Sequence, residues 1–184
     1  MSRFPIDVLK SKETGRLVIK VWLFEKITQY FVYSVFVIVF PVIAIIEFYF
    51  DLDKNESIVL SLLLLTLSLT ISALLIYSIV KVNSLKRING LSRGKNSILI
   101  KKIAESNNWN ISSSNQQITI IDFSWQDVGT DWGKQITILY DENDILVNCI
   151  SFGLNSIPSP FHWFANKRKV NKLKVEFENR IKSI

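Results

Sequence analysis

Residues 59–80 read VLSLLLLTLSLTISALLIYSIV, and the rest of the chain is organised around them. From Ser57 to Val80, 24 consecutive residues carry no charge, glycine or proline. A helix of this length is about 36 Å long, enough to cross a hydrocarbon core of roughly 30 Å with some tilt. A core helix of a soluble protein needs a polar face, whereas this stretch offers only scattered serines and threonines. We therefore predict a membrane-spanning helix over residues 57–80.

An earlier apolar stretch predicts a second span over residues 27–50. It is uncharged from Ile27 to Ile46 and has aromatic residues at both ends, as is typical of interfacial belts. Pro41 predicts a local kink. Glu47 falls near the end of the span, where its carboxylate can reach water, so we do not interpret it as an ion site. Residues 51–56 then form a short connection between two antiparallel helices.

The basic residues around the two spans predict their orientation. Six lysines and arginines precede the first span, one lies between the spans, and five lie between Lys81 and Lys95. Because cytoplasmic flanks retain positive charge, we expect both termini in the cytoplasm and the short loop outside. The protein is thus expected in a membrane, and we assign it to the inner membrane of a bacterium.

The flanks also account for the net charge of +6. Nucleic acid is the competing partner of a basic protein, but most of the lysine and arginine lies close to the apolar segments, which favours membrane lipid. Residues 81–96 are predicted to be a basic linker at the headgroup surface. Its expected lipid contacts are Lys81, Lys86, Arg87, Arg93 and Lys95.

Residues 1–26 carry basic residues but no cleavage site of a signal peptide, so we expect them to be retained. Within them, residues 17–24 read LVIKVWLF and lead directly into the first span. We expect this segment to lie in the membrane interface, with Trp22 at headgroup depth. Docking of the same segment against the soluble domain is the alternative.

Small polar residues in the second span lie on two opposite sides of the helix. At 100° per residue, one side holds serines and the other holds Thr66, Thr70 and Ala73. Small residues allow helices to approach closely, so one side is expected to pack on the first span and the other is left for another subunit. Simple tolerance of serine and threonine in membrane helices explains the same pattern. The candidate packing face consists of Ser57, Ser61, Ser68 and Ser72.

Residues 97–184 have the polar mix of a small cytosolic α+β domain. Helices are predicted over residues 97–107 and 167–181, and three strands over 118–123, 135–140 and 145–152. Residues 107–117 are rich in asparagine and serine and are expected to form turns. The expected fold is α-β-β-β-α, with an antiparallel sheet and helices on one face. The full chain is therefore predicted to be a two-helix transmembrane hairpin followed by this domain.

The search for a catalytic or metal site is negative. Cys149 and His162 are the only cysteine and histidine, which excludes an intrachain disulfide and a zinc site built from several cysteines and histidines. The chain contains no P-loop, dinucleotide fingerprint, nucleophile elbow or H-E-x-x-H motif. The element order loosely resembles metal-dependent nuclease cores, but the third strand lacks their E-x-K. We predict no catalytic residue, metal or cofactor.

Two segments remain as candidate ligand or partner patches. Residues 124–133 place two indoles and two carboxylates on one loop, beside a third carboxylate on the preceding strand, which suits a ligand pocket or a cation. Residues 157–168 carry aromatics next to basic residues, which suits a membrane surface or an anionic ligand. The structural alternatives are indoles that anchor the loop to the core and a loop tucked under the sheet. The candidate residues are Asp122, Trp125, Asp127, Asp131, Trp132, His162 and Trp163.

The layout of two spans and a small cytosolic domain is similar to that of several unrelated groups, including membrane-bound effectors of bacterial defence, although no motif carries this likeness. The first hypothesis is a non-enzymatic, membrane-anchored interaction module. It would bind a protein or small ligand at the cytoplasmic face, and its spans would tether it or join a larger membrane complex. The second is an oligomerising effector or pore-forming protein gated by a ligand of the cytosolic domain. A membrane-bound enzyme is a third hypothesis that no residue pattern supports.

Overall fold

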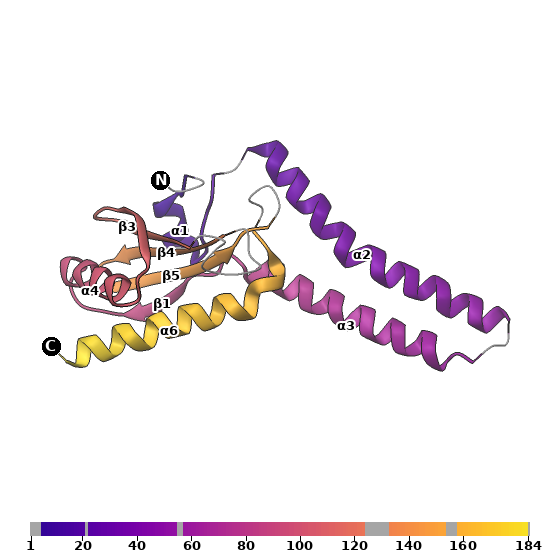
Figure 1. The fold of residues 1–184 in the computed structure, drawn as a ribbon. Helices are drawn as coiled ribbons and strands as arrows, with labels where there is room; N and C mark the ends of the chain where they lie inside the picture. Colours follow the sequence, from indigo (N-terminus) through magenta and orange to yellow (C-terminus); the bar gives the residue numbers. More distant parts are fainter. Residues whose placement is uncertain (1–4, 21, 55–56, 124–132, 154–157, 184) are drawn as a thin grey trace. The chain divides into compact units, whose positions relative to one another are not determined.

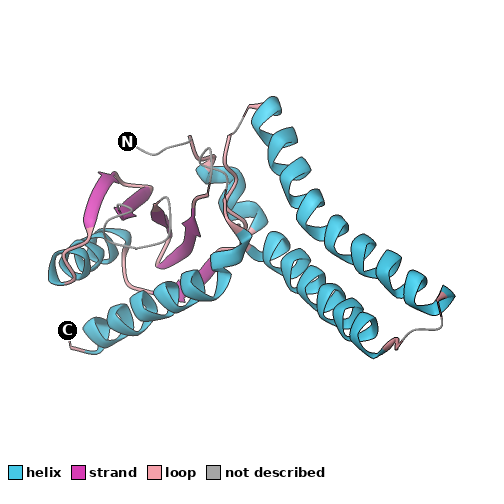
Figure 2. Ribbon diagram, turned by 45° about the vertical axis from the view of Figure 1, so that its right-hand side comes forward, coloured by secondary structure: helices cyan, strands magenta, loops and turns pink. Residues whose placement is uncertain are grey.

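The computed structural model describes residues 5–20, 22–54, 57–123, 133–153 and 158–183 (Figure 1). The chain divides into two compact units. One unit is the segment 22–81, and the other combines residues 1–21 with residues 82–184. Figure 2 shows that the first is purely helical, whereas the second contains the strands.

The helical unit consists of α2 (Leu23–Asp53) and α3 (Val59–Lys81). They run side by side as a hairpin (Figures 1 and 2). Both helices are long and apolar enough to cross a membrane, as predicted from the two uncharged stretches. Helix α2 continues through Pro41.

The serine face of α3 lies against the partner helix of the hairpin. Ser61, Ser68 and Ser72 are buried, and Ser72 Oγ donates a hydrogen bond of 3.0 Å to the carbonyl of Val37 in α2. Ser57 differs from the prediction, because it precedes α3 and is exposed. The opposite side, formed by Thr66, Thr70 and Ala73, is exposed in the hairpin. Both threonine hydroxyls donate to the carbonyl four residues earlier.

The second unit is built on a five-stranded antiparallel sheet of order β1-β5-β4-β3-β2. The strands are β1 (Lys86–Asn89), β2 (Asn110–Ser114), β3 (Ile118–Phe123), β4 (Lys134–Asp141) and β5 (Asp144–Ser151). Strands β3, β4 and β5 confirm the three predicted strands and their antiparallel order.

Two strands correct the prediction. Strand β1 occupies part of the predicted linker, and there Arg87 forms salt bridges of 2.8 Å with both Asp141 and Asp144. Lys86 donates a hydrogen bond to Asn171 of helix α6 (Trp163–Lys182). Lys86 and Arg87 therefore bind partners within the domain instead of extending freely from a linker. Strand β2 occupies the segment expected to form turns. Both lie at sheet edges and carry few apolar residues, so pairing with a neighbouring strand determines their conformation more than their own propensity does.

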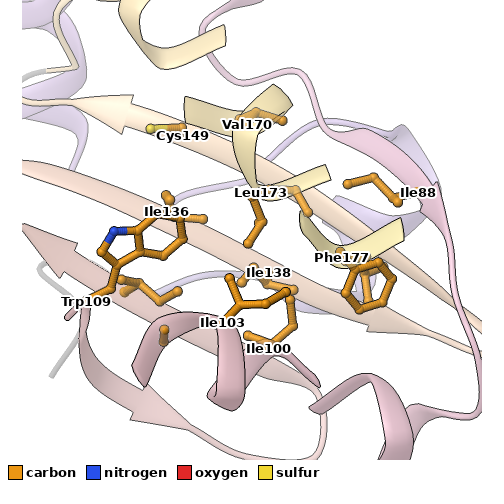
Figure 3. Close-up of a cluster of buried hydrophobic side chains, with 14 of the residues drawn as sticks. Ile88, Ile100, Ile103, Trp109, Ile136, Ile138, Cys149, Val170, Leu173 and Phe177 are labelled. Atoms are coloured by element: carbon orange, nitrogen blue, oxygen red, sulfur yellow. The ribbon is translucent and has the colours of Figure 1, made fainter. Parts of the chain in front are cut away.

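Helices α4 (Arg93–Ser106) and α6 (Trp163–Lys182) cover one face of the sheet. Figure 3 shows Leu173 and Phe177 of α6 and Ile100 of α4 pointing into one cluster with Ile136 and Ile138 of β4. All five are fully buried. The buried apolar residues Val170, Leu173 and Phe177 are therefore the contact face of α6 with the sheet.

The other face of the sheet is covered by the N-terminal arm, residues 5–20, which includes α1 (Val8–Thr14). Ile6 and Val8 pack on the apolar side chains of β3, β4 and β5 that point away from α4 and α6. Leu17 is 2% exposed and packs with Ile150 and Phe152. The sheet thus has helices on both faces, which corrects the predicted one-faced arrangement. For Leu17 the structure also shows docking on the domain instead of a place in the membrane interface.

The arm joins the domain through backbone pairing with the segment that follows α3. Arg16 and Ser84 form an antiparallel bridge, and Leu17 N donates to the carbonyl of Asn83 at 2.7 Å. We call this pairing, together with the contacts of Asn148 described next, the clamp. It brings together two chain segments that α2 and α3 separate in the sequence.

Asn148 of β5 holds one side of the clamp. Its amide nitrogen donates to the carbonyls of Val82 and Ser84, both at 2.9 Å. Asn148 is almost fully buried, so water has little access to replace these bonds.

We predict that Asn148→Ala destabilises this unit by about 1–3 kcal/mol, because a buried carbonyl loses its donor. Chemical denaturation of the full chain in nanodiscs, followed by near-UV circular dichroism, measures the change. Asn179→Ala, at an exposed position of α6, is the matched control and should leave the transition within about 0.5 kcal/mol. Equal midpoints for the two variants would contradict the role given to Asn148.

Candidate functional site

Both segments singled out in the sequence meet the sheet at the same end. Phe123 ends β3 and pairs with Lys134, the first residue of β4, which pairs in turn with Ser151 at the end of β5. The described residues on either side of segment 124–132 therefore lie at this end, and the segment itself lies outside the described residues. The segment leading to α6 returns there as well, because Phe152 forms a bridge with Pro158. Two patches predicted separately are thus anchored at one place.

Lysines and aromatic rings lie together at this end. Lys169 Nζ is 4.8 Å from the ring centroid of Trp109 and 4.4 Å from that of Phe123. The two rings contact each other edge to face, with centroids 5.6 Å apart. Lys172 Nζ is 5.8 Å from the Trp109 ring, and Lys134 is only 8% exposed. We call this part of the domain the lysine end of the sheet.

The surroundings of Lys169 at the lysine end disfavour its protonated, positively charged form. Burial lowers the pKa of Lys169, and the charges of Lys172 and Lys134 lower this pKa further. Cys149 and Glu176 act in the opposite direction but do not reverse the shift. Within the described residues, the Lys169 ammonium group packs on the two rings and forms no salt bridge. An anion placed here would gain from the partly desolvated Lys169, whereas Lys172 is exposed and already binds Glu176 at 3.7 Å and Asn107 at 2.8 Å.

Polar side chains from β5 and α6 lie beside the lysines. Asn166 is buried, and its side-chain oxygen accepts a hydrogen bond of 2.8 Å from Ser151 Oγ. Cys149 Sγ lies 3.6 Å from the same oxygen. Cys149 is buried. The shared acceptor holds Ser151 and Cys149 in a structural network.

The predicted patch residues fall into two groups. Trp125, Asp127, Asp131 and Trp132 lie outside the described residues. Asp122 is half-buried in β3, and by strand alternation it faces the side of the sheet opposite to Phe123. The remaining two residues, His162 and Trp163, lie at the start of α6.

His162 and Trp163 are positioned by a short turn that precedes α6. His162 ends the 3-10 turn Pro160–His162, and its Nδ1 lies 2.9 Å from Ser159 Oγ. Trp163 opens α6, contacts Phe164 edge to face at 4.5 Å, and lies under Lys167 Nζ at 5.0 Å from the ring centroid. This short stretch therefore combines aromatic rings with a cation.

None of the five residues of the lysine end was a candidate residue, although Lys169 directly follows the candidate segment 157–168. One signal for Lys134 was present. It precedes Ile136 and Ile138 with the period of a strand, so it belongs to the same face of the sheet as these core residues. Trp109 is buried in the core cluster of the domain.

Among the described residues, no three histidine, cysteine, aspartate or glutamate side chains lie close enough to hold a metal ion. Comparisons with protein-family models, curated proteins and solved structures gave no match for this chain.

Proposed function

We propose that the protein is an integral membrane protein whose helices α2 and α3 cross the bilayer. The support is the exposure of their apolar side chains within the hairpin. Leu60, Leu63 and Leu74 of α3 are 67%, 58% and 56% exposed. Soluble proteins seldom leave so many large apolar side chains together in water, whereas lipid covers them at no cost in polar contacts.

The charge distribution supports an orientation with the sheet-containing unit in the cytoplasm. Lysine and arginine are concentrated on both flanks of the α2–α3 hairpin, and only Lys54 lies in the connection. By this rule the connection lies outside. The bacterial inner membrane fits the same rule.

Cysteine labelling in intact cells tests the spans and their orientation together. We predict that a membrane-impermeant maleimide labels Asp53→Cys in intact cells and labels Lys182→Cys only after permeabilisation. Both positions are exposed, and native Cys149 is buried, so the wild-type chain supplies the background. Labelling of Lys182→Cys before permeabilisation would contradict the orientation, and release of the chain by alkaline carbonate would contradict the spans.

We propose further that the unit outside the bilayer is a binding module and that its lysine end accepts an anionic group. The observation that carries this proposal is Lys169, enclosed by Trp109 and Phe123 and close to Lys134 and Lys172. Holding Lys169 partly desolvated near two further lysines costs stability, and an anion offsets that cost. The described residues supply groups for binding and orientation, which favours a non-enzymatic role.

Inorganic phosphate serves as the probe for this site. We predict that phosphate raises the unfolding temperature of the full chain in phosphatidylcholine nanodiscs, relative to chloride at equal ionic strength. At a concentration ten times the Kd, the stabilisation is about 1.4 kcal/mol. Lys169→Gln should lose most of this gain, and the exposed control Lys182→Gln should keep it. An equal gain in both variants would contradict the lysine end as the binding site.

A second candidate function is an oligomerising membrane effector. The observation that favours it is the side of α3 formed by Thr66, Thr70 and Ala73, which the hairpin leaves exposed. Small side chains there would let another helix approach closely. The two candidates differ in subunit number, since a simple tether needs no second copy.

A further inference from the structure

The start of α6 presents aromatic and basic side chains to solvent. Phe161 is 56% exposed and Phe164 is 63% exposed, which is unusual for phenylalanine. Lys167 and Arg168 follow within one helical turn and are exposed as well. We call these four residues the α6 patch. Lys167 is attracted to the Trp163 ring, so cation and aromatic groups already lie in contact beside the patch.

The charge around the patch has one sign along a long stretch of chain. Residues 145–175 contain no aspartate or glutamate, whereas five lysines and arginines lie between residues 167 and 174. Basic side chains extend long apolar stems and place their charge at a polar surface. Exposed phenylalanines followed along the helix by such side chains suit the boundary between acyl chains and anionic headgroups.

The patch begins at the end of the sheet from which the chain leaves for α3. Strand β1 runs antiparallel to β5, with Lys86 opposite Val147, so Val82 lies towards the Ser151 end of β5. Asn148 bonds to the Val82 carbonyl and confirms this position. The segment before α6 reaches the same end, because Ser159 N donates to the carbonyl of Ser151 at 2.8 Å.

The N-terminal connection leaves from this end too. Leu17 packs on Ile150 and Phe152 near the end of β5. Lys20 is still bonded to the arm, since its N–H donates to the carbonyl of Pro5. Leu23 begins α2 only three residues later, and an extended chain spans about 3.5 Å per residue. The chain connections that lead from this end of the sheet to α2 and to α3 are therefore short.

We propose that the α6 patch docks on the anionic surface of the bilayer that α2 and α3 cross, with Phe161 and Phe164 at headgroup depth and Lys167 and Arg168 on lipid phosphates. This inference rests on the proposed membrane-spanning function. Because the connections to α2 and α3 are short, docking is an intramolecular event at high effective concentration, and weak affinity suffices. A lipid surface is favoured over a soluble polyanion because exposed phenylalanines contribute to binding only where acyl chains are available.

A fluorescent probe placed beside the patch tests the docking. The full chain is reconstituted in nanodiscs with Ala165→Cys, or with Asn179→Cys as the matched control near the far end of α6. Both positions are exposed, and the thiols carry an environment-sensitive fluorophore. Lipids that carry a quencher report contact with the bilayer. We expect quenching at position 165 in discs containing phosphatidylserine, much less quenching in phosphatidylcholine alone, and none at position 179.

Charge variants distinguish docking of the α6 patch from a general electrostatic attraction between the basic domain and anionic lipid. Lys167→Gln combined with Arg168→Gln should lower the docked-to-free ratio at position 165 roughly 25-fold, about fivefold per cation. Lys182→Gln should leave the ratio unchanged. Added salt should weaken docking of the wild type in the same discs.

Three results would overturn the proposal, and two of them are positive signals. One is equal quenching at positions 165 and 179. Another is protection of the probe at position 165 only after RNA or an acidic peptide is added, which would assign the patch to a soluble partner. The third is entry into nanodiscs without quenching at position 165, which overturns the docking alone, whereas failure of the chain to enter nanodiscs would contradict the spans themselves.

Discussion

The clamp between the N-terminal arm and the segment after α3 is the interaction on which the sheet-containing unit depends. Arg16 pairs with Ser84, Leu17 bonds to Asn83, and Asn148 holds the two carbonyls on the other side. The clamp seats the arm on the second face of the sheet. Without that cover, the apolar side chains on this face would meet water, at a cost of about 25 cal/mol for each Å² exposed.

The clamp also lies at the end of the sheet where the candidate sites are found. It fixes the end of the sheet from which the chain leaves in both directions, and the lysine end and the start of α6 lie at that same end. Positive charge held near a bilayer attracts anionic headgroups and anionic ligands alike. In our proposal the partly buried Lys169 and the exposed Lys167 and Arg168 divide these tasks, because the first is desolvated among aromatic rings and the others are exposed.

Residue pattern alone predicted the elements with a strong apolar period. The length of the uncharged stretches identified α2 and α3, and runs of β-branched residues identified β3, β4 and β5. In α6 the buried apolar residues are spaced three and four positions apart. Strand β1 was missed because Ile88 is its one buried apolar residue. Residues 17–24 were assigned to the membrane interface because their apolar side chains lead straight into a span, and the sequence does not tell whether lipid or the domain covers Leu17.

The candidate site was predicted only in outline. The sequence identified two aromatic segments, but the position of the second at one end of the sheet depends on strand register and on the direction of α6. The burial of Lys134 and the position of Lys169 between two rings depend on the same tertiary contacts. The two basic segments of the sequence therefore contain residues with different contacts, from Arg87, which forms salt bridges in β1, to Arg168, which is exposed on α6.

A disulfide between the two sides of the clamp tests this account most directly. Arg16→Cys with Ser84→Cys places thiols on two residues paired in an antiparallel bridge, where a disulfide can form without backbone movement. Mild oxidation of the full chain in native membranes should yield the linked peptides by mass spectrometry. The control pair is Arg16→Cys with Lys101→Cys, at an exposed position of α4, and it should stay reduced. Free, reactive thiols at both positions 16 and 84 after oxidation would contradict the clamp.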